Sequence, residues 1–89
     1  MLFAPILTQR GLIMNPQIEK AIGKNIRTIR ESQQITQEQL SAKLQIEGCD
    51  ITRSALAKME VGQRHIYPDE IMLIKKLLKT TYDEIFNID

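Results

Sequence analysis

Residues 36–62, TQEQLSAKLQIEGCDITRSALAKMEVG, decide the fold of this chain. The stretch holds two short patterns of the same design, each opened by a threonine and each followed by a glycine. Thr36 and Thr52 are suited to the N-cap position, where a side-chain oxygen accepts an otherwise unpaired backbone N–H. Gly48 and Gly62 are suited to close a helix, because glycine adopts the left-handed conformation without strain. The stretch therefore predicts two short helices joined by a turn.

One helix is expected before this pair and two after it. The first begins at Asn15-Pro16, and its isoleucines recur at spacings that place them on one helix face: Ile18, Ile22, Ile26 and Ile29. A fourth helix starts near Pro68, where proline suits the first helical position. A short fifth helix follows Thr81.

The predicted core is made of aliphatic residues and methionine. In the second to fourth helices it comprises Leu40, Leu44 with Ala42 alongside, Leu56, Met59, Ile71, Met72, Ile74, Leu77 and Leu78, and the short fifth helix carries Tyr82, Ile85 and Phe86. Only 4% of the chain is aromatic, and no run alternates with the two-residue period of a strand. The expected fold class is all-α, a compact five-helix domain.

At 89 residues the chain builds one domain. Residues 1–14 are expected to be a flexible arm or a start-site extension, and residues 15–89 the folded domain. The single Cys49 has no disulfide partner, and His65 does not complete a metal site with it. We expect no metal, no cofactor, no membrane span and a cytoplasmic location.

Charge gives a weak indication of function. The net charge is +1, but residues 1–64 hold 9 basic and 6 acidic side chains while residues 65–89 hold 3 and 5. A basic body suits a DNA-binding face, although many proteins that never bind DNA share it.

The third helix, about residues 52–60, has an outer face suited to reading DNA. Arg53, Ser54 and Lys58 are hydrogen-bond donors, separated by small alanines that permit close approach to a duplex. Arginine and lysine donate to guanine O6 and N7 in the major groove. On this helix alone, an ordinary solvated face explains the pattern equally well.

Three motifs together resemble a known family. They are IGKNIRTIRESQQITQEQLSAKL at 22–44, ITRSALAKMEVGQR at 51–64 and the closing TTYDEIF at 80–86. The chain resembles the lambda-repressor/Cro-type helix-turn-helix family, also called the xenobiotic-response-element family, over about residues 18–87. The resemblance implies a transcriptional regulator that binds double-stranded DNA sequence-specifically and places helix 52–60 in the major groove. Repression is the expected sign, because a chain of 89 residues offers little surface for contacting polymerase.

The resemblance also implies roles for individual residues. Arg53, Ser54 and Lys58 match base-reading positions. Phosphate contacts are implied for Gln37, Thr52, Gln63 and Arg64. Arg30 and Glu60 match a buried ion pair that serves the scaffold. One departure concerns residues 45–50, which make a longer connection than the family's usual short turn and leave the angle of the recognition helix open.

The chain carries no Gly-rich phosphate loop and no nucleophile–base set, so we expect no enzyme. The alternative function is a protein-interaction module, such as a toxin-binding antitoxin, that works through the C-terminal helices. Residues there are also suited to a homodimer that reads a palindromic operator: Tyr82, Ile85, Phe86 and Ile88.

Overall fold

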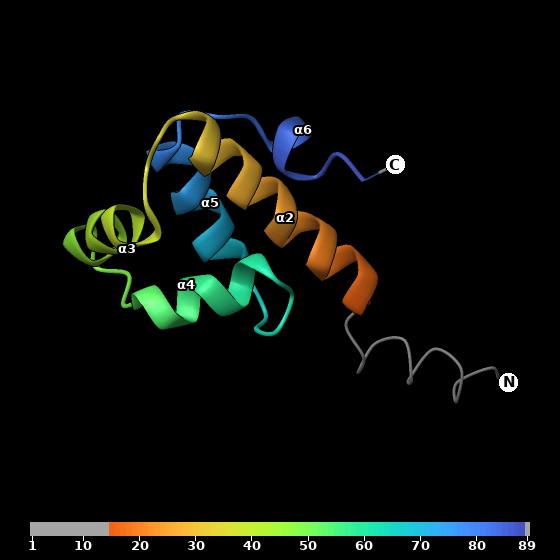
Figure 1. Cartoon of the computed structure of the whole chain (residues 1–89), viewed down its shortest axis with the longest axis horizontal. Coiled ribbons are helices and arrows are strands. Elements are labelled where there is room, and N and C mark those ends of the chain that lie inside the picture. The colour runs from red at the N-terminus through yellow and green to blue at the C-terminus, as the bar shows by residue number, and fades with distance from the viewer. Residues whose placement is uncertain (1–14, 89) are drawn as a thin grey trace, which may run out of the picture.

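The computed structural model describes residues 15–88, so the predicted arm at 1–14 and the terminal Asp89 lie outside the described part. The described helices are α2 (Pro16–Ser32), α3 (Gln37–Ile46), α4 (Arg53–Glu60), α5 (Pro68–Leu77) and α6 (Tyr82–Ile85) (Figure 1). Residues 15–88 contain no strand, and none of their helices has the length and apolar character needed to cross a bilayer. The all-α five-helix prediction is confirmed.

The predicted threonine caps form in the structure. Thr36 Oγ1 accepts the Gln39 N–H at 3.0 Å, while Gln39 Oε1 accepts the Thr36 N–H at 2.9 Å. Thr52 Oγ1 accepts the Ala55 N–H at 3.1 Å, and Thr81 caps α6 in the same way. These bonds satisfy backbone donors that a helix start leaves unpaired, so they set where each helix begins.

The core lies where α2, α3, α4 and α5 meet. Its most deeply buried side chains are Ile26, Leu40, Leu44, Ile51, Leu56, Met59, Ile74, Leu78 and Ile85. Fully burying one such side chain is worth about 1.5–3 kcal/mol.

Three predicted core positions are wrong. Met72 is 60% exposed, and Ala42 is also exposed. Each lies two residues from a buried residue of its own helix, and a step of two residues turns a helix by about 200°, toward the opposite face. Ile18, in the first turn of α2, is 43% exposed.

The helices α2 and α4 lie in close contact at Gly23. A Cβ atom at this position would lie 2.1 Å from the carbonyl oxygen of Met59. No side chain other than hydrogen fits there, so the backbone of α4 rests directly on α2. This role of Gly23 was not predicted from the sequence.

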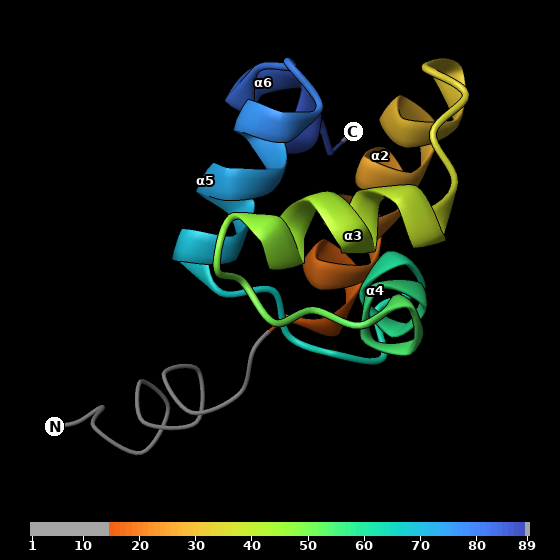
Figure 2. The same cartoon turned by 90° about the vertical axis from the view of Figure 1, so that its left-hand side faces the viewer.

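The last helix is attached to α2 by Asn25. Its Nδ2 donates to the carbonyl oxygens of Ile85 at 2.8 Å and Asn87 at 3.0 Å. In both Figure 1 and Figure 2, α6 lies at the opposite end of the molecule from α4. Helices α4 and α6 therefore lie on two separate faces of the molecule.

Candidate nucleic-acid interface

The turn between α3 and α4 comprises residues 47–52. It begins with a helix ending at Gly48 and ends with Thr52 in extended backbone conformation. The helix α3 continues to Ile46 before it stops. Gly48 then takes a φ of +87°, and the Cys49 N–H donates to the Leu44 carbonyl at 2.9 Å. A left-handed glycine with this backbone bond is a common way to close a helix. The six-residue connection is thus compatible with the helix pair (Figure 2).

Side chains of α3 fix the end of this turn. Ser41 Oγ donates to the Ile51 carbonyl at 2.6 Å, and Gln45 Nε2 approaches the same oxygen at 3.3 Å. The Ile51 side chain is itself buried in the core. These bonds hold the start of α4 against α3. Neither of these α3 residues was predicted from the sequence, although Ser41 adjoins the buried Leu40.

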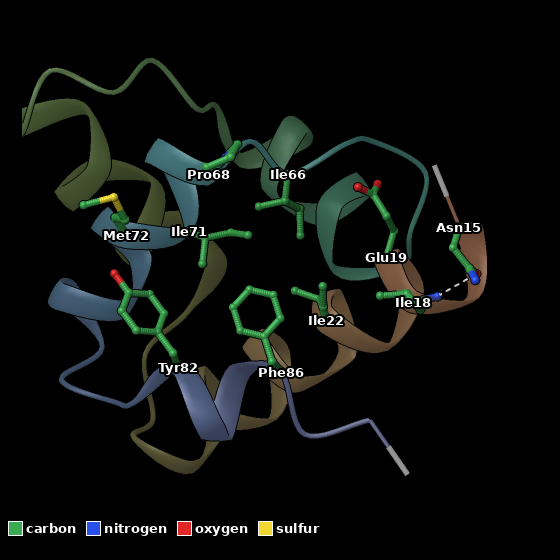
Figure 3. A pocket seen from close by; sticks show the side chains of 10 residues that line it. All are labelled: Asn15, Ile18, Glu19, Ile22, Ile66, Pro68, Ile71, Met72, Tyr82 and Phe86. Carbon is green, nitrogen blue, oxygen red and sulfur yellow. Dashed lines mark hydrogen bonds between the residues drawn. The ribbon is translucent and has the colours of Figure 1, made fainter. Parts of the chain in front are cut away.

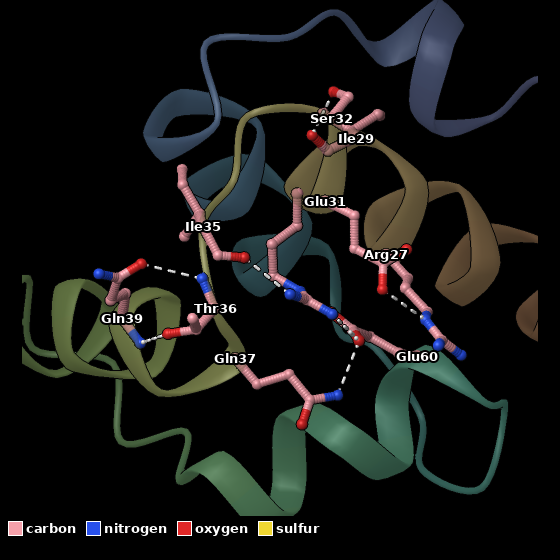
Figure 4. A network of polar contacts seen from close by, with 10 residues as sticks. Arg27, Ile29, Glu31, Ser32, Ile35, Thr36, Gln37, Gln39 and Glu60 are labelled. Atoms are coloured by element: carbon pink, nitrogen blue, oxygen red, sulfur yellow. Dashed lines mark hydrogen bonds and ion pairs between the residues drawn. The ribbon is translucent and has the colours of Figure 1, made fainter.

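The end of α4 is held by a buried polar network. Glu60 accepts from Arg30 Nε at 2.7 Å and Nη2 at 2.9 Å, and also from Gln37 Nε2 at 2.9 Å (Figure 4). The Arg30 and Glu60 side chains are 7% and 1% exposed. Arg30 Nη1 donates to the Ile35 carbonyl at 2.7 Å. Glu60 therefore joins α4 to both α2 and α3.

This network keeps its arginine charged. The hydrogen bonds that Arg30 donates to the Glu60 carboxylate raise the pKa of Arg30, and this effect exceeds the opposing effect of burial. A bidentate guanidinium–carboxylate pair also fixes direction, because both groups are planar. The orientation of α4 is set from its inner side.

The outer side of α4 is open. Arg53, Ser54 and Lys58 are all exposed, and Ala55 and Ala57 between them are half-buried. Ser54 and Lys58 are four residues apart and thus share one helix face. The three residues with implied base contacts are therefore accessible together, on a helix whose opposite side is anchored.

Arg53 also borders a polar hollow of about 530 Å³ at the start of α3. Its other lining residues are Arg27, Arg30, Glu31, Thr36, Gln37 and Glu38. The hollow brings Gln37 and Arg53 together with Arg27, which the sequence analysis did not select. Arg27 Nε lies 3.2 Å from Glu31 on an exposed part of α2.

The loop after α4 places its two implied phosphate contacts differently. Gln63 is exposed, whereas Arg64 is bound by the Glu70 carboxylate at 3.0 and 3.1 Å and donates to the His65 carbonyl at 2.8 Å. Burial raises the pKa of Glu70, but Arg64 and the Tyr67 N–H together lower it more, so the net shift is downward. Arg64 thus fastens the loop to α5.

Comparison with known proteins gives one match. The model of a family described as helix-turn-helix matches residues 26–85 of this chain. The matched region contains all of α3, the turn and α4. No curated protein and no solved structure matches the chain.

Proposed function

The chain belongs to the lambda-repressor/Cro-type helix-turn-helix family of DNA-binding transcription regulators, and from this premise we propose that it reads a specific duplex sequence through α4. In this arrangement α4 enters the major groove and α3 crosses the backbone, as in other helix-turn-helix domains. Base edges in the major groove differ in donor and acceptor pattern, so exposed donors on α4 are able to choose among them.

The observation that carries this proposal is the contrast between the two sides of α4. Its inner side is fixed by Leu56, Met59 and Glu60, all buried. Its outer side exposes Arg53, Ser54 and Lys58. A rigid helix that presents long donors between small residues supplies the fixed geometry on which base reading depends.

Phosphate contacts would set the position of the protein on the duplex. Gln37 remains a candidate because its amide nitrogen carries two hydrogens, and the bond to Glu60 uses one of them. Thr52, at the N-cap of α4, and Gln63, in the loop after α4, are both exposed. Arg64 would contact phosphate while it keeps its ion pair with Glu70.

The test is selection from a random duplex pool with the wild type and the double variant Arg53→Ala/Lys58→Ala. We expect the wild type to enrich one motif and the variant to lose it. Two lost base contacts cost roughly 2–6 kcal/mol in binding. Circular dichroism checks that the variant keeps its helices.

The matched control is Lys24→Ala/Lys76→Ala, which removes the same charge from exposed positions on α2 and α5. We expect it to keep the motif and to weaken binding equally for all sequences, because the exposed Lys76–Glu47 pair that it breaks contributes little to the fold and the remaining change is in general attraction to phosphate. If wild type and both variants enrich nothing, α4 does not read sequence. A protein partner, such as a toxin, then becomes the better assignment.

We further propose that the protein acts as a homodimer on a palindromic operator and represses transcription. Repression needs only occupancy of the operator, whereas activation needs an additional surface for polymerase. Tyr82, Phe86 and Ile88 are between 39% and 44% exposed and are suited to the dimer contact. Ile85, expected there from the sequence, is fully buried and takes no part.

A further inference from the structure

A second hollow, formed by α2, α5 and α6, plays no part in the proposed DNA contact. It has a volume of about 530 Å³. Figure 3 shows Phe86, Ile22 and Ile71 around its centre, with Met72 and Tyr82 toward one end and Ile18 and Asn15 toward the other. Ile66 and Pro68 complete its apolar lining, and Glu19 lies near Ile18. We call this hollow the apolar groove.

The apolar groove leaves large side chains partly uncovered. Ile18 and Phe86 are 43% and 44% exposed, and Met72 is 60% exposed. Single exposed apolar residues are ordinary, but a group that lines one concave surface marks a binding site. Pockets of this volume with mostly apolar walls take extended apolar groups.

The chain itself supplies a segment of matching chemistry. Asn15, which borders the groove, caps α2 by accepting the N–H groups of Gln17 and Ile18 at 3.0 and 3.2 Å. The residues that precede it therefore join the described structure at the rim of the groove. Their sequence, MLFAPILTQRGLIM, contains no acidic residue and only one charged side chain, Arg10.

We propose that residues 1–13 occupy the apolar groove, with Phe3 and Leu7 as the principal contacts. Reach is sufficient, because thirteen extended residues span up to about 45 Å, while the 17 residues of α2 span about 25 Å. Attachment at the rim also favours this occupant over a free partner, since a tethered segment acts at a high effective concentration.

A covered groove has a consequence for assembly. Tyr82 and Phe86 line the groove and also belong to the proposed dimer contact. The segment and a second copy would therefore compete for these two residues. This consequence rests on the proposed dimer, whereas occupancy of the groove does not depend on dimer formation or on DNA binding.

The test uses the full chain, isotope-labelled, at a concentration where sedimentation shows a monomer. We expect nuclear Overhauser effects between Phe3 or Leu7 and Ile71 or Met72. In Phe3→Asp/Leu7→Asp these effects disappear and the methyl resonances of Ile71 and Met72 shift. Ile46, which is 83% exposed at the end of α3, serves as the internal reference and stays unchanged.

The matched control is Thr8→Asp/Gln9→Asp, which adds the same charge to polar positions of the same segment and should keep the contacts. Absence of the effects in the wild type, with identical groove resonances in all three proteins, overturns the proposal. So does a result in which the contacts appear only between labelled and unlabelled copies, since a second chain then fills the groove. Neither result bears on the duplex selection, which tests α4 separately.

Discussion

The two faces of this small domain are built on opposite principles. The inner side of α4 is held by directional bonds, with Glu60 accepting from Arg30 and Gln37 at 2.7–2.9 Å. The apolar groove formed by α2, α5 and α6 is lined by side chains that leave much of their surface uncovered, such as Met72 at 60%. Helix α4 is anchored by hydrogen bonds, whereas the apolar groove has side chains that no described residue covers completely.

The difference between the two regions indicates how a short chain fixes the orientation of a helix. Apolar packing is non-directional, so it tolerates small rotations of a helix, whereas a bidentate ion pair with a third donor does not. We infer that the polar network holds α4 because a rotation of this helix by a few degrees would change which bases its exposed side chains reach. The apolar groove can accept an adaptable occupant, because no such precision is needed there.

The largest expected effect comes from removing the centre of the anchored face. Glu60→Ala leaves Arg30 buried without its carboxylate, and loss of one partner of a buried pair costs about 3–5 kcal/mol. In a domain of this size that lowers Tm by more than 12 °C, at roughly 4–8 °C per kcal/mol. Differential scanning calorimetry measures it.

The control for this variant is an ion pair of the same chemistry on the surface. Arg27 and Glu31 are each 53% exposed, so Arg27→Ala should cost less than about 0.5 kcal/mol. Equal losses in the two variants would show that burial does not distinguish the pairs, and the comparison between the faces would fail.

A smaller effect is expected where α4 rests on α2. Gly23→Ala places a methyl group 2.1 Å from the Met59 carbonyl, and overpacking of this kind costs about 1–3 kcal/mol. Chemical denaturation measures the loss. Lys24→Ala, at the next and exposed position, should lie within about 0.5 kcal/mol of wild type, and a similar cost for both would argue against a tight crossing.

Sequence reasoning located the helices well because their ends carry local signals. Thr36, Thr52 and Thr81 each bond within three residues, so the interaction is visible in the order of the residues. The family motifs likewise predicted the helix-turn-helix. Both depend on short spacings that a single sequence displays.

Contacts between distant segments could not be obtained in this way. Gly23 is close to Met59 only because two helices cross, and Arg64 is paired with Glu70 only because the loop folds back on α5. The same is true of Arg27, which lines the same polar hollow as Arg53. Met72 was misplaced because its type favours the core while its angular position on α5 points outward.

The loop between the two faces should show a pH-dependent contribution. The pKa of Glu70 is lowered from 4.5, so its pairing with Arg64 stabilises the fold above that pH and is lost as pH falls through the folded-state pKa. At neutral pH Glu70→Gln should cost about 1 kcal/mol, less than a fully buried pair, because the Arg64 side chain is 30% exposed.

Urea denaturation of wild type and Glu70→Gln between pH 3 and 7 measures this contribution. The difference between them should shrink as the solution is acidified, because wild-type Glu70 then becomes neutral like glutamine. If the difference in free energy of unfolding between the two proteins stays constant with pH, the effect of the substitution comes from altered packing or hydrogen bonding and not from the charge of Glu70.

The smallest expected effect tests whether residues 1–13 occupy the apolar groove. A side chain as exposed as Met72 contributes almost nothing by itself, so Met72→Ala should be neutral if the groove is empty. Under the proposed cover we expect a loss of about 0.5 kcal/mol, since a covered methionine buries additional apolar surface. The same substitution in the Phe3→Asp/Leu7→Asp background should then cost nothing, because residues in contact are not additive. Equal costs in both backgrounds would show that Met72 does not contact residues 1–13. The control is Ile46→Ala, which shortens an exposed apolar side chain outside the groove and gives the baseline cost of such a change.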